Sequence, residues 1–151
     1  MFRNILLFLK PKVKIVLLNK DAITPKKATA GSGGFDIYAI KDVTIKAFES
    51  NEVLTGFSMQ FSSNYVAMIF TRSSLGKKDI YPSNGGTAIF DSDYRDEVSI
   101  RIKNNSNVEY TIKKGDRFAQ MVFLPLPKMN IVKVQKLNIT TRNGGQGSTG
   151  K

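Results

Sequence analysis

Apolar and polar residues alternate along much of this chain, most regularly over residues 57–61 and 98–103. A period of two residues places alternate side chains on opposite faces of an extended backbone, as in a β-strand with one buried and one solvated face. Helical periodicity is almost absent, and the one exception predicted is a short helical turn within residues 73–78. The other strands that the pattern predicts are 13–18, 35–40, 43–46, 65–70, 111–112, 117–124 and 131–137.

Segments rich in glycine, proline and asparagine separate these strands about every ten residues. Short strands with regular turns are typical of an all-β sandwich, jelly roll or barrel. We therefore predict one all-β domain, a jelly-roll-like barrel or sandwich, over residues 12–140. Residues 1–11 precede it as an extension. Residues 141–151 carry four glycines and almost no apolar side chains, so they are expected to form a flexible, glycine-rich C-terminal arm.

The composition narrows the chemistry further. The chain has no His and no Cys, which excludes Ser-His-Asp and Cys-His catalysis, Cys/His zinc sites and disulfides. A general base must then be Asp, Glu, Lys or Tyr, and a divalent metal must be bound by oxygen, for which Mg²⁺ is the natural candidate. The first ten residues contain only five consecutive apolar residues, too few for a signal sequence or a membrane span. We expect a soluble, cytoplasmic protein, or one inside a host cell if the chain is viral.

The net charge points to anionic partners. Lys plus Arg is 23 and Asp plus Glu is 12, which gives a formal net charge of +11. The basic residues are scattered, with pairs such as Lys26-Lys27 and Lys113-Lys114 as the densest clusters. Proteins that bind single-stranded nucleic acid combine basic and aromatic residues on one surface, and no strand here does so. We expect a generally basic surface and no specific nucleic-acid partner.

One acidic segment is a candidate for catalysis. Asp91, Asp93, Asp96 and Glu97 lie within seven residues, just before the predicted strand at 98–103. A period of two would place Asp91 and Asp93 on one face, near enough to perturb each other's pKa. The alternative is a solvated hairpin tip, because runs of charge usually lie at the surface. The residues alone leave both interpretations open.

Two other segments have the residue types that bind phosphate. Arg72, Ser73 and Ser74 follow an apolar strand and open the predicted helical turn, although a capped surface turn has the same composition. Residues 145–151 match the spacing of a P-loop as far as its lysine. The chain given lacks the Ser or Thr and the helix that must follow, so we reject a P-loop. A glycine-rich arm can still contact phosphates through its backbone amides.

Taken together, five segments resemble, in order and spacing, the five motifs of the homotrimeric dUTPase family, whose members hydrolyse dUTP to dUMP and pyrophosphate. They are residues 30–39, 72–76, 85–98, 115–121 and 144–150. The resemblance covers nearly the whole chain from Val13 onward. It implies a homotrimer in which three subunits share each active site. It also implies Mg²⁺ held chiefly by the triphosphate and water, with no metal ligand supplied directly by the protein.

The resemblance also assigns roles to residues. It makes Asp91 the base that activates the water attacking the α-phosphorus, and it places Tyr94 against the deoxyribose. Uracil is expected to be recognised mostly by backbone groups of a hairpin before Asp91. The residues expected to bind substrate are Arg72, Ser73, Ser74, Asn84, Gly85, Ile89, Phe90, Tyr94, Gln120, Arg142, Gln146, Gly147 and Ser148, with Asp36 in support.

The fifth motif departs from the family pattern. Gln146 stands where an aromatic residue usually covers the uracil, which predicts weaker dUTP binding, and Gln146→Phe is expected to tighten it. Arg142 is one position closer to that residue than the usual arginine, whose register is occupied by Thr141. The third motif differs too, at Ala88, Phe90 and Asp96.

Two alternatives to a dUTPase stay open at this point. One is a dCTP deaminase or bifunctional enzyme of the same fold. The other is a catalytically weak, dUTPase-like module for nucleotide binding or signalling, which Gln146 keeps open. The segment Asp91-Ser92-Asp93-Tyr94 favours the hydrolase.

Overall fold

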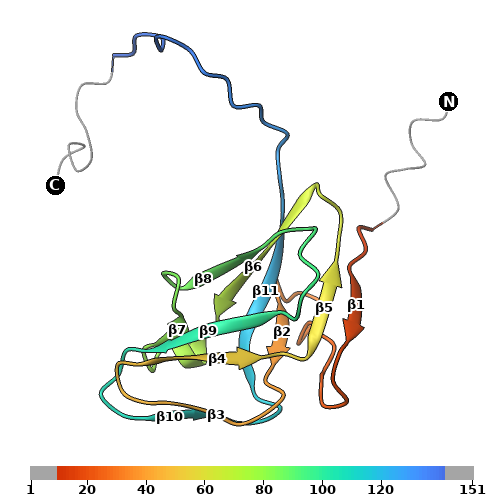
Figure 1. Cartoon of the computed structure of the whole chain (residues 1–151), viewed down its shortest axis with the longest axis vertical. Coiled ribbons are helices and arrows are strands. Elements are labelled where there is room, and N and C mark those ends of the chain that lie inside the picture. The colour runs from red at the N-terminus through yellow and green to blue at the C-terminus, as the bar shows by residue number, and fades with distance from the viewer. Residues whose placement is uncertain (1–9, 142–151) are drawn as a thin grey trace.

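The structure is a computed structural model that describes residues 10–141 (Figure 1). Strands dominate this part of the chain, with one helical turn, α1. The elements are β1 (Lys14–Leu17), β2 (Phe35–Tyr38), β3 (Val43–Ile45), β4 (Ser50–Leu54), β5 (Phe57–Gln60), β6 (Tyr65–Thr71), α1 (Ser73–Gly76), β7 (Ile80–Pro82), β8 (Thr87–Phe90), β9 (Ser99–Asn104), β10 (Tyr110–Ile112) and β11 (Arg117–Pro125). No helix within residues 10–141 is long and apolar enough to cross a membrane.

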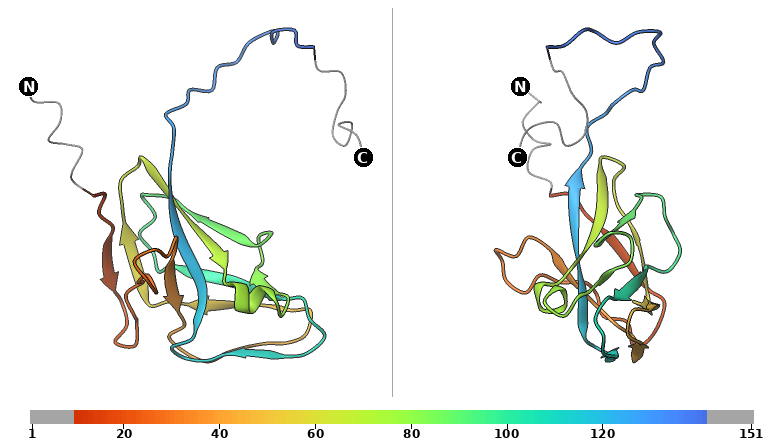
Figure 2. Two further views of the ribbon diagram at one scale, coloured as in Figure 1. Left: turned by 180° about the vertical axis from the view of Figure 1, so that it is seen from behind. Right: turned by 90° about the vertical axis from the view of Figure 1, so that its left-hand side faces the viewer.

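All the strands pair antiparallel, in two main sheets and two short ribbons. The larger sheet has the order β2-β11-β6-β8 and the smaller one β4-β9-β7, while β1 pairs with β5 and β3 with β10. Figures 1 and 2 show β4 and β9 crossing the face of the larger sheet, with β11 running through the middle of the molecule. The all-β jelly-roll fold predicted from the alternating pattern is confirmed.

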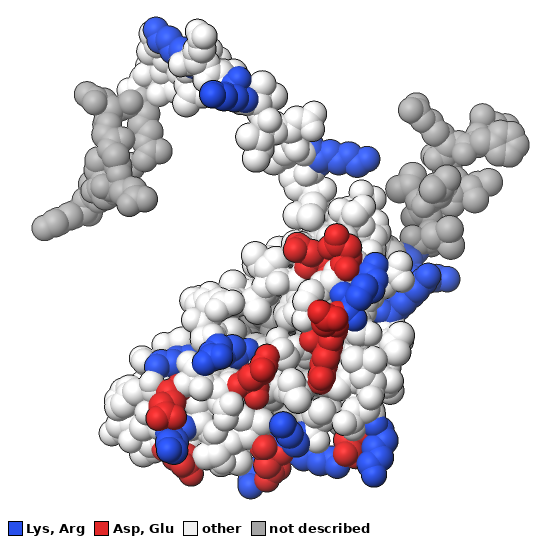
Figure 3. Space-filling model, in the orientation of Figure 1, with Lys and Arg blue, Asp and Glu red and all other residues white. Residues whose placement is uncertain are grey.

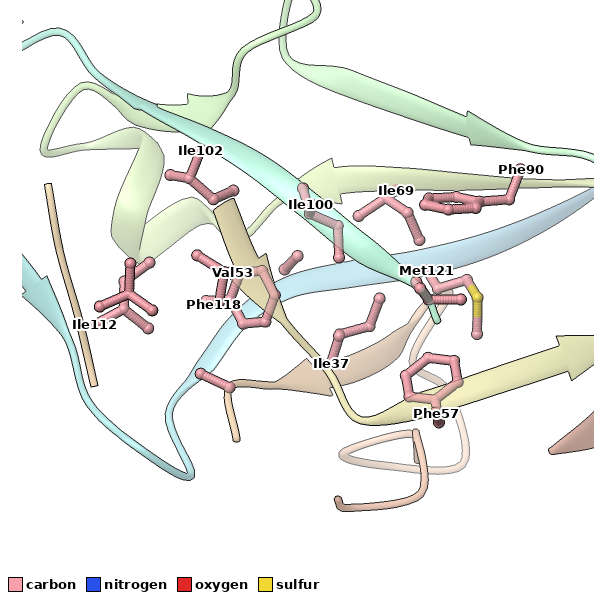
Figure 4. Packing of buried hydrophobic residues seen from close by; sticks show 14 of the residues in the cluster. Ile37, Val53, Phe57, Ile69, Phe90, Ile100, Ile102, Ile112, Phe118 and Met121 are labelled. Carbon is pink, nitrogen blue, oxygen red and sulfur yellow. The ribbon is translucent and has the colours of Figure 1, made fainter. Parts of the chain in front are cut away.

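The hydrophobic core fills the space between the two sheets (Figure 4). Ile100 and Ile102 of β9 are buried while Arg101 between them is exposed, as the two-residue period requires. On the opposite layer, Ile69 and Met121 are likewise almost fully buried. Burying a side chain of this size stabilises the fold by about 1.5–3 kcal/mol. The core therefore fixes the strands that carry the polar residues described below.

The predicted strand at 131–137 is wrong. Residues 126–141 leave the domain as an extended segment without a strand (Figure 1). Ile131 is fully exposed and Leu137 is 80% exposed. An extended segment becomes a strand only when another strand satisfies its backbone groups, and the described part of this one chain provides no such partner here.

Three short strands, β4, β7 and β8, were not predicted from the alternating pattern. β4 contains Ser50, Asn51 and Glu52 and buries only Val53 fully, so its apolar signal is too weak to recognise. Its backbone nevertheless pairs with β9 over five positions. β7 and β8 flank a glycine-containing turn and have three and four residues, too few to show a period. The helical turn predicted within 73–78 is confirmed as α1.

Candidate functional site

A polar pocket of about 290 Å³ lies where β2, β11 and the start of α1 come together. We call it the arginine pocket. It gathers side chains from three of the sequence motifs, which are far apart along the chain. Its lining residues are Ala28, Ser32, Gly33, Gly34, Asp36, Arg72, Ser73 and Gln120. Four residues expected in one site, namely Asp36, Arg72, Ser73 and Gln120, are thus brought together.

Asp36 contacts two arginines at the arginine pocket. Its side chain is only 11% exposed. Nε of Arg72 lies 3.1 Å from its Oδ1, and Nη1 of Arg117 lies 3.2 Å from its Oδ2. Nη1 of Arg72 also donates a hydrogen bond of 3.1 Å to the Arg117 carbonyl. The ion pair with Asp36 and the hydrogen bond to Arg117 together restrain the Arg72 guanidinium, while Arg117 donates a charged hydrogen bond to Asp36.

The strand register explains why Gln120 joins this group. Asp36 and Gln120 are direct partners in the β2–β11 ladder. Nε2 of Gln120 donates a hydrogen bond of 3.2 Å to the carbonyl of Thr71, the residue before Arg72. A Cβ on Gly34 would lie 3.2 Å from Oε1 of Gln120 and 3.3 Å from the Met121 carbonyl, so a larger residue here would displace its neighbours by a few tenths of an ångström.

Ser74 faces a second pocket, on the other side of Arg72. This pocket has a volume of about 220 Å³. Its lining residues are Arg72, Ser74, Leu75, Tyr110, Ile112, Asp116, Arg117 and Phe118. Ser73 and Ser74 therefore flank Arg72 instead of lining one pocket together.

The segment Asp91–Glu97, which we call the acidic turn, follows the end of β8. The amide of Tyr94 donates to the carbonyl of Asp91 at 3.2 Å, which closes the turn. The side chains of Asp91 and Asp93 are exposed. The segment is a turn and not a strand, yet exposed Asp91 and Asp93 alternate with half-buried Ser92 and Tyr94. Figure 3 shows acidic and basic side chains intermingled over the face drawn there.

Tyr94 is held in place from two sides. Its ring meets Phe90 edge to face, with 5.4 Å between ring centroids, and its hydroxyl donates to the Glu97 carbonyl at 3.2 Å. Oε1 of Glu97 in turn accepts a hydrogen bond of 2.7 Å from the Gly56 amide. The acidic turn is thus anchored while Asp91 projects into solvent. Phe90 is buried and belongs to the core, so it can offer a ligand only main-chain groups.

The segment before Asp91 is not a two-stranded hairpin, contrary to expectation. β7 pairs with β9 and β8 pairs with β6, so the two strands belong to different sheets. The turn between them contains Gly85 and Gly86 with φ of 73° and 91°, values that favour glycine. A pocket of about 440 Å³ beside this turn is lined by Thr71, Gly76, Tyr81, Gly85 and Gly86. Asn84 and Ile89 are exposed.

The acidic turn and the arginine pocket lie at opposite ends of β6. Phe90, next to Asp91, pairs with Ala67, which is five residues before Arg72. At about 3.4 Å per residue of strand, the two groups are about 17 Å apart along β6. A single chain therefore does not bring Asp91 to Arg72.

Four of the expected site residues lie outside the described residues: Arg142, Gln146, Gly147 and Ser148. Conversely, one residue of the Asp36 network was not singled out from the sequence. Arg117 stands at the exposed start of β11, and neither its spacing nor its neighbours in the sequence indicate a contact with Asp36 across β2. Only the ladder between the two strands reveals that contact.

The fold and the arginine pocket define a class of protein, an all-β jelly roll in which guanidinium, hydroxyl and amide groups of distant segments line one polar pocket. The family model described as dUTPase matches residues 10–150, and the chain belongs to the dUTPase family. It is 38% identical over 141 residues to the deoxyuridine 5'-triphosphate nucleotidohydrolase of Nautilia profundicola, covering 93% of this chain and 99% of that one. The enzyme of the same name from Helicobacter pylori strain P12 is 34% identical over 140 residues, covering 92% and 97%.

Solved structures of phage dUTPases share the fold. The dUTPase of Staphylococcus bacteriophage 80alpha with dUPNHPP matches with a TM-score of 0.83 at 22% identity, covering 92% of this chain and 98% of that one. A mutant of the dUTPase from phage phi11 of S. aureus, described with a structural Mg(II) ion, matches with a TM-score of 0.77 at 21% identity, over 85% and 99%. The predicted family and fold are both confirmed.

Proposed function

We propose that this protein hydrolyses dUTP to dUMP and pyrophosphate, in a site that two or more copies of the chain complete. The observation that carries the proposal is the arginine pocket, where Arg72, Ser73 and Gln120 converge around a fixed guanidinium. The family and the relatives named for dUTP hydrolysis support this substrate.

The arginine pocket is suited to the triphosphate. Within residues 10–141, Arg72 uses Nε and Nη1 for internal contacts, which leaves Nη2 to donate to a phosphate oxygen. The Ser73 hydroxyl and the Gln120 side chain line the same pocket. Donors that are already fixed stabilise the charge that develops on phosphate oxygens without having to reorganise during the reaction.

Asp91 is proposed as the general base. An exposed carboxylate can accept the proton of a water molecule as that water attacks the α-phosphorus in line. The new bond joins the water oxygen to phosphorus, the bond from the α-phosphorus to the bridging oxygen breaks, and pyrophosphate leaves. Tyr94, held by Phe90 and Glu97, is proposed to lie against the deoxyribose.

The donor set of the arginine pocket fits a metal ion carried by the substrate. It consists of guanidinium, hydroxyl and amide groups around one carboxylate, and that carboxylate is already shared by two arginines. Mg²⁺ in such sites keeps several waters and binds substrate phosphates. We propose that Mg²⁺ would enter on the triphosphate and would there neutralise phosphate charge.

We propose a homotrimer, the number of subunits that the family resemblance implies, and two features of the described chain support assembly. If Asp91 and Arg72 serve one site, their separation along β6 calls for a second chain to complete it. The segment 126–139 also carries a row of exposed apolar side chains that a single chain leaves uncovered: Leu126, Met129, Ile131, Val132, Val134, Leu137 and Ile139. Exposed apolar surface of this extent marks an interaction site. We propose that this segment packs on a neighbouring copy and directs the C-terminal arm towards that copy's site.

Pyrophosphate release from dUTP, dCTP, dTTP and UTP, with and without Mg²⁺, tests the proposal. We expect rapid turnover with dUTP alone, dependent on Mg²⁺. Ammonia release from dCTP would instead indicate a deaminase or bifunctional enzyme. Tight dUTP binding without turnover would indicate a binding or signalling module.

A further inference from the structure

Arg117 shares the Asp36 carboxylate with Arg72. Nη1 of Arg117 lies 3.2 Å from Oδ2, while Nε of Arg72 lies 3.1 Å from Oδ1. Each carboxylate oxygen therefore faces a different arginine. Asp36 is a bridge between the two guanidinium groups and not the partner of one alone.

The main chain of Arg117 also holds Arg72. The β2–β11 register shifts between Arg117 and Ala119, which marks a β-bulge. Bulges interrupt the ladder locally and redirect groups near functional sites. Next to this bulge, the Arg117 carbonyl accepts the hydrogen bond from Nη1 of Arg72. Arg117 thus contacts Arg72 once through its backbone and once through Asp36.

The side chain of Arg117 does not line the arginine pocket. It is 46% exposed and lines the second pocket, beside Ser74. Arg117 therefore lies on the far side of Arg72 from Ser73. Arg117 contacts two residues that line the arginine pocket, Arg72 and Asp36, so its influence on a ligand there passes through these two side chains.

A free carboxylate prefers to bind one arginine with both oxygens, in a bidentate pair. We propose that Arg117 is a positioning residue that prevents this pairing. By occupying Oδ2, it restricts Asp36 to a single contact with Nε of Arg72 and keeps Nη2 of Arg72 directed to phosphate. This inference deepens the proposed function and rests on its assignment of the arginine pocket to the triphosphate.

Binding of inorganic tripolyphosphate to the full chain, measured by calorimetry, tests this role. We expect Arg117→Gln to weaken binding about tenfold in the natural chain. In a chain that already carries Arg72→Gln, the same substitution is expected to change binding less than about twofold, because Arg72 is no longer present to be misplaced. The matched control is Arg101→Gln on the exposed face of β9, which removes the same charge and is expected to change binding less than about twofold in either chain.

Arg117→Lys is a second, more conservative variant in case Arg117→Gln does not fold. It keeps the positive charge with a single donor group, and we expect a loss of a few fold that again disappears with Arg72→Gln. Thermal melts identify any variant that fails to fold. Equal losses with and without Arg72 would overturn the inference, since they indicate direct contact with the ligand. An unchanged affinity, or no tripolyphosphate binding by the natural chain, would overturn it as well.

Turnover separates this inference from the proposed function. Absence of dUTP hydrolysis by the natural chain, with the tripolyphosphate results as expected, would refute only the proposed function. Normal dUTP hydrolysis with equal losses in both backgrounds would refute only the role of Arg117.

Discussion

Asp36 and Asp91 are both carboxylates of the expected site, and the chain places them in opposite environments. Asp36 is nearly buried, and two arginines of the same chain neutralise it. Asp91 is exposed, and its turn is closed by main-chain contacts. The contacts of the arginine pocket thus form within one chain, whereas the Asp91 carboxylate faces solvent. In the proposed shared site, the first half depends on folding and the second on assembly.

Asp91→Asn has the largest expected effect on activity. Loss of a general base lowers kcat by about a hundredfold to ten-thousandfold. Because Asp91 is exposed, the melting temperature is expected to stay unchanged within the scatter of surface substitutions. Single-turnover kinetics, dUTP binding and thermal melts of the same preparation check both parts. Unchanged turnover would remove Asp91 from the role of base.

Substitution of the apolar segment tests assembly next. Ile131→Asp combined with Leu137→Asp places two charges where we propose contact with a neighbouring copy. We expect light scattering to show smaller species and turnover to fall about tenfold or more at low protein concentration. Val108→Asp, at a 63% exposed apolar position elsewhere, is the control and is expected to retain both. Equal behaviour of the two proteins would contradict a role for this segment.

Asp36→Asn is expected to affect stability more than Asp91→Asn does. It removes the charge shared by Arg72 and Arg117, whose side chains are 26% and 46% exposed, so solvent screens part of the interaction. A loss of about 1–3 kcal/mol follows from charged hydrogen bonds of this kind. Chemical denaturation measures it. If the Asp36→Asn and Asp91→Asn proteins had the same free energy of unfolding, the proposed difference between the two regions would be contradicted.

Asp42, which belongs to neither region, provides the smallest expected effect. Its pKa is lowered from 3.8 chiefly by the hydrogen bond from the Lys114 backbone and then by the hydrogen bond from the Lys113 side chain, while desolvation opposes this and the charge of Lys113 adds the smallest contribution. A lowered pKa in the folded state contributes stability above the unfolded pKa, and this is lost as pH falls through the folded pKa. Asp42→Asn is therefore expected to lower the melting temperature slightly at pH 7 and not at all well below pH 3.8. A constant difference across this range would contradict it.

The residues of the arginine pocket could be predicted only in part from their own chemistry. Residue types indicated a phosphate site at Arg72, Ser73 and Ser74, whereas the resemblance to the dUTPase family added Asp36 and Gln120. The geometry of the acidic turn depends on local hydrogen bonds that the residue order does not show. The prediction of a strand at 131–137 was wrong because alternating apolar and polar residues show which side chains favour burial. The pattern does not show whether the same chain provides a strand to pair with. Arg117 was missed because its contact with Asp36 arises across a ladder.

Mixing two inactive variants tests most directly whether copies of the chain share a site. Chains with Asp91→Asn and chains with Arg72→Gln are unfolded, combined in equal amounts and refolded together. In a trimer whose sites take these two residues from different copies, every mixed trimer regains one intact site. Random assembly then restores about a quarter of natural turnover. If one copy supplied both residues of a site, the mixture would stay as inactive as either variant alone.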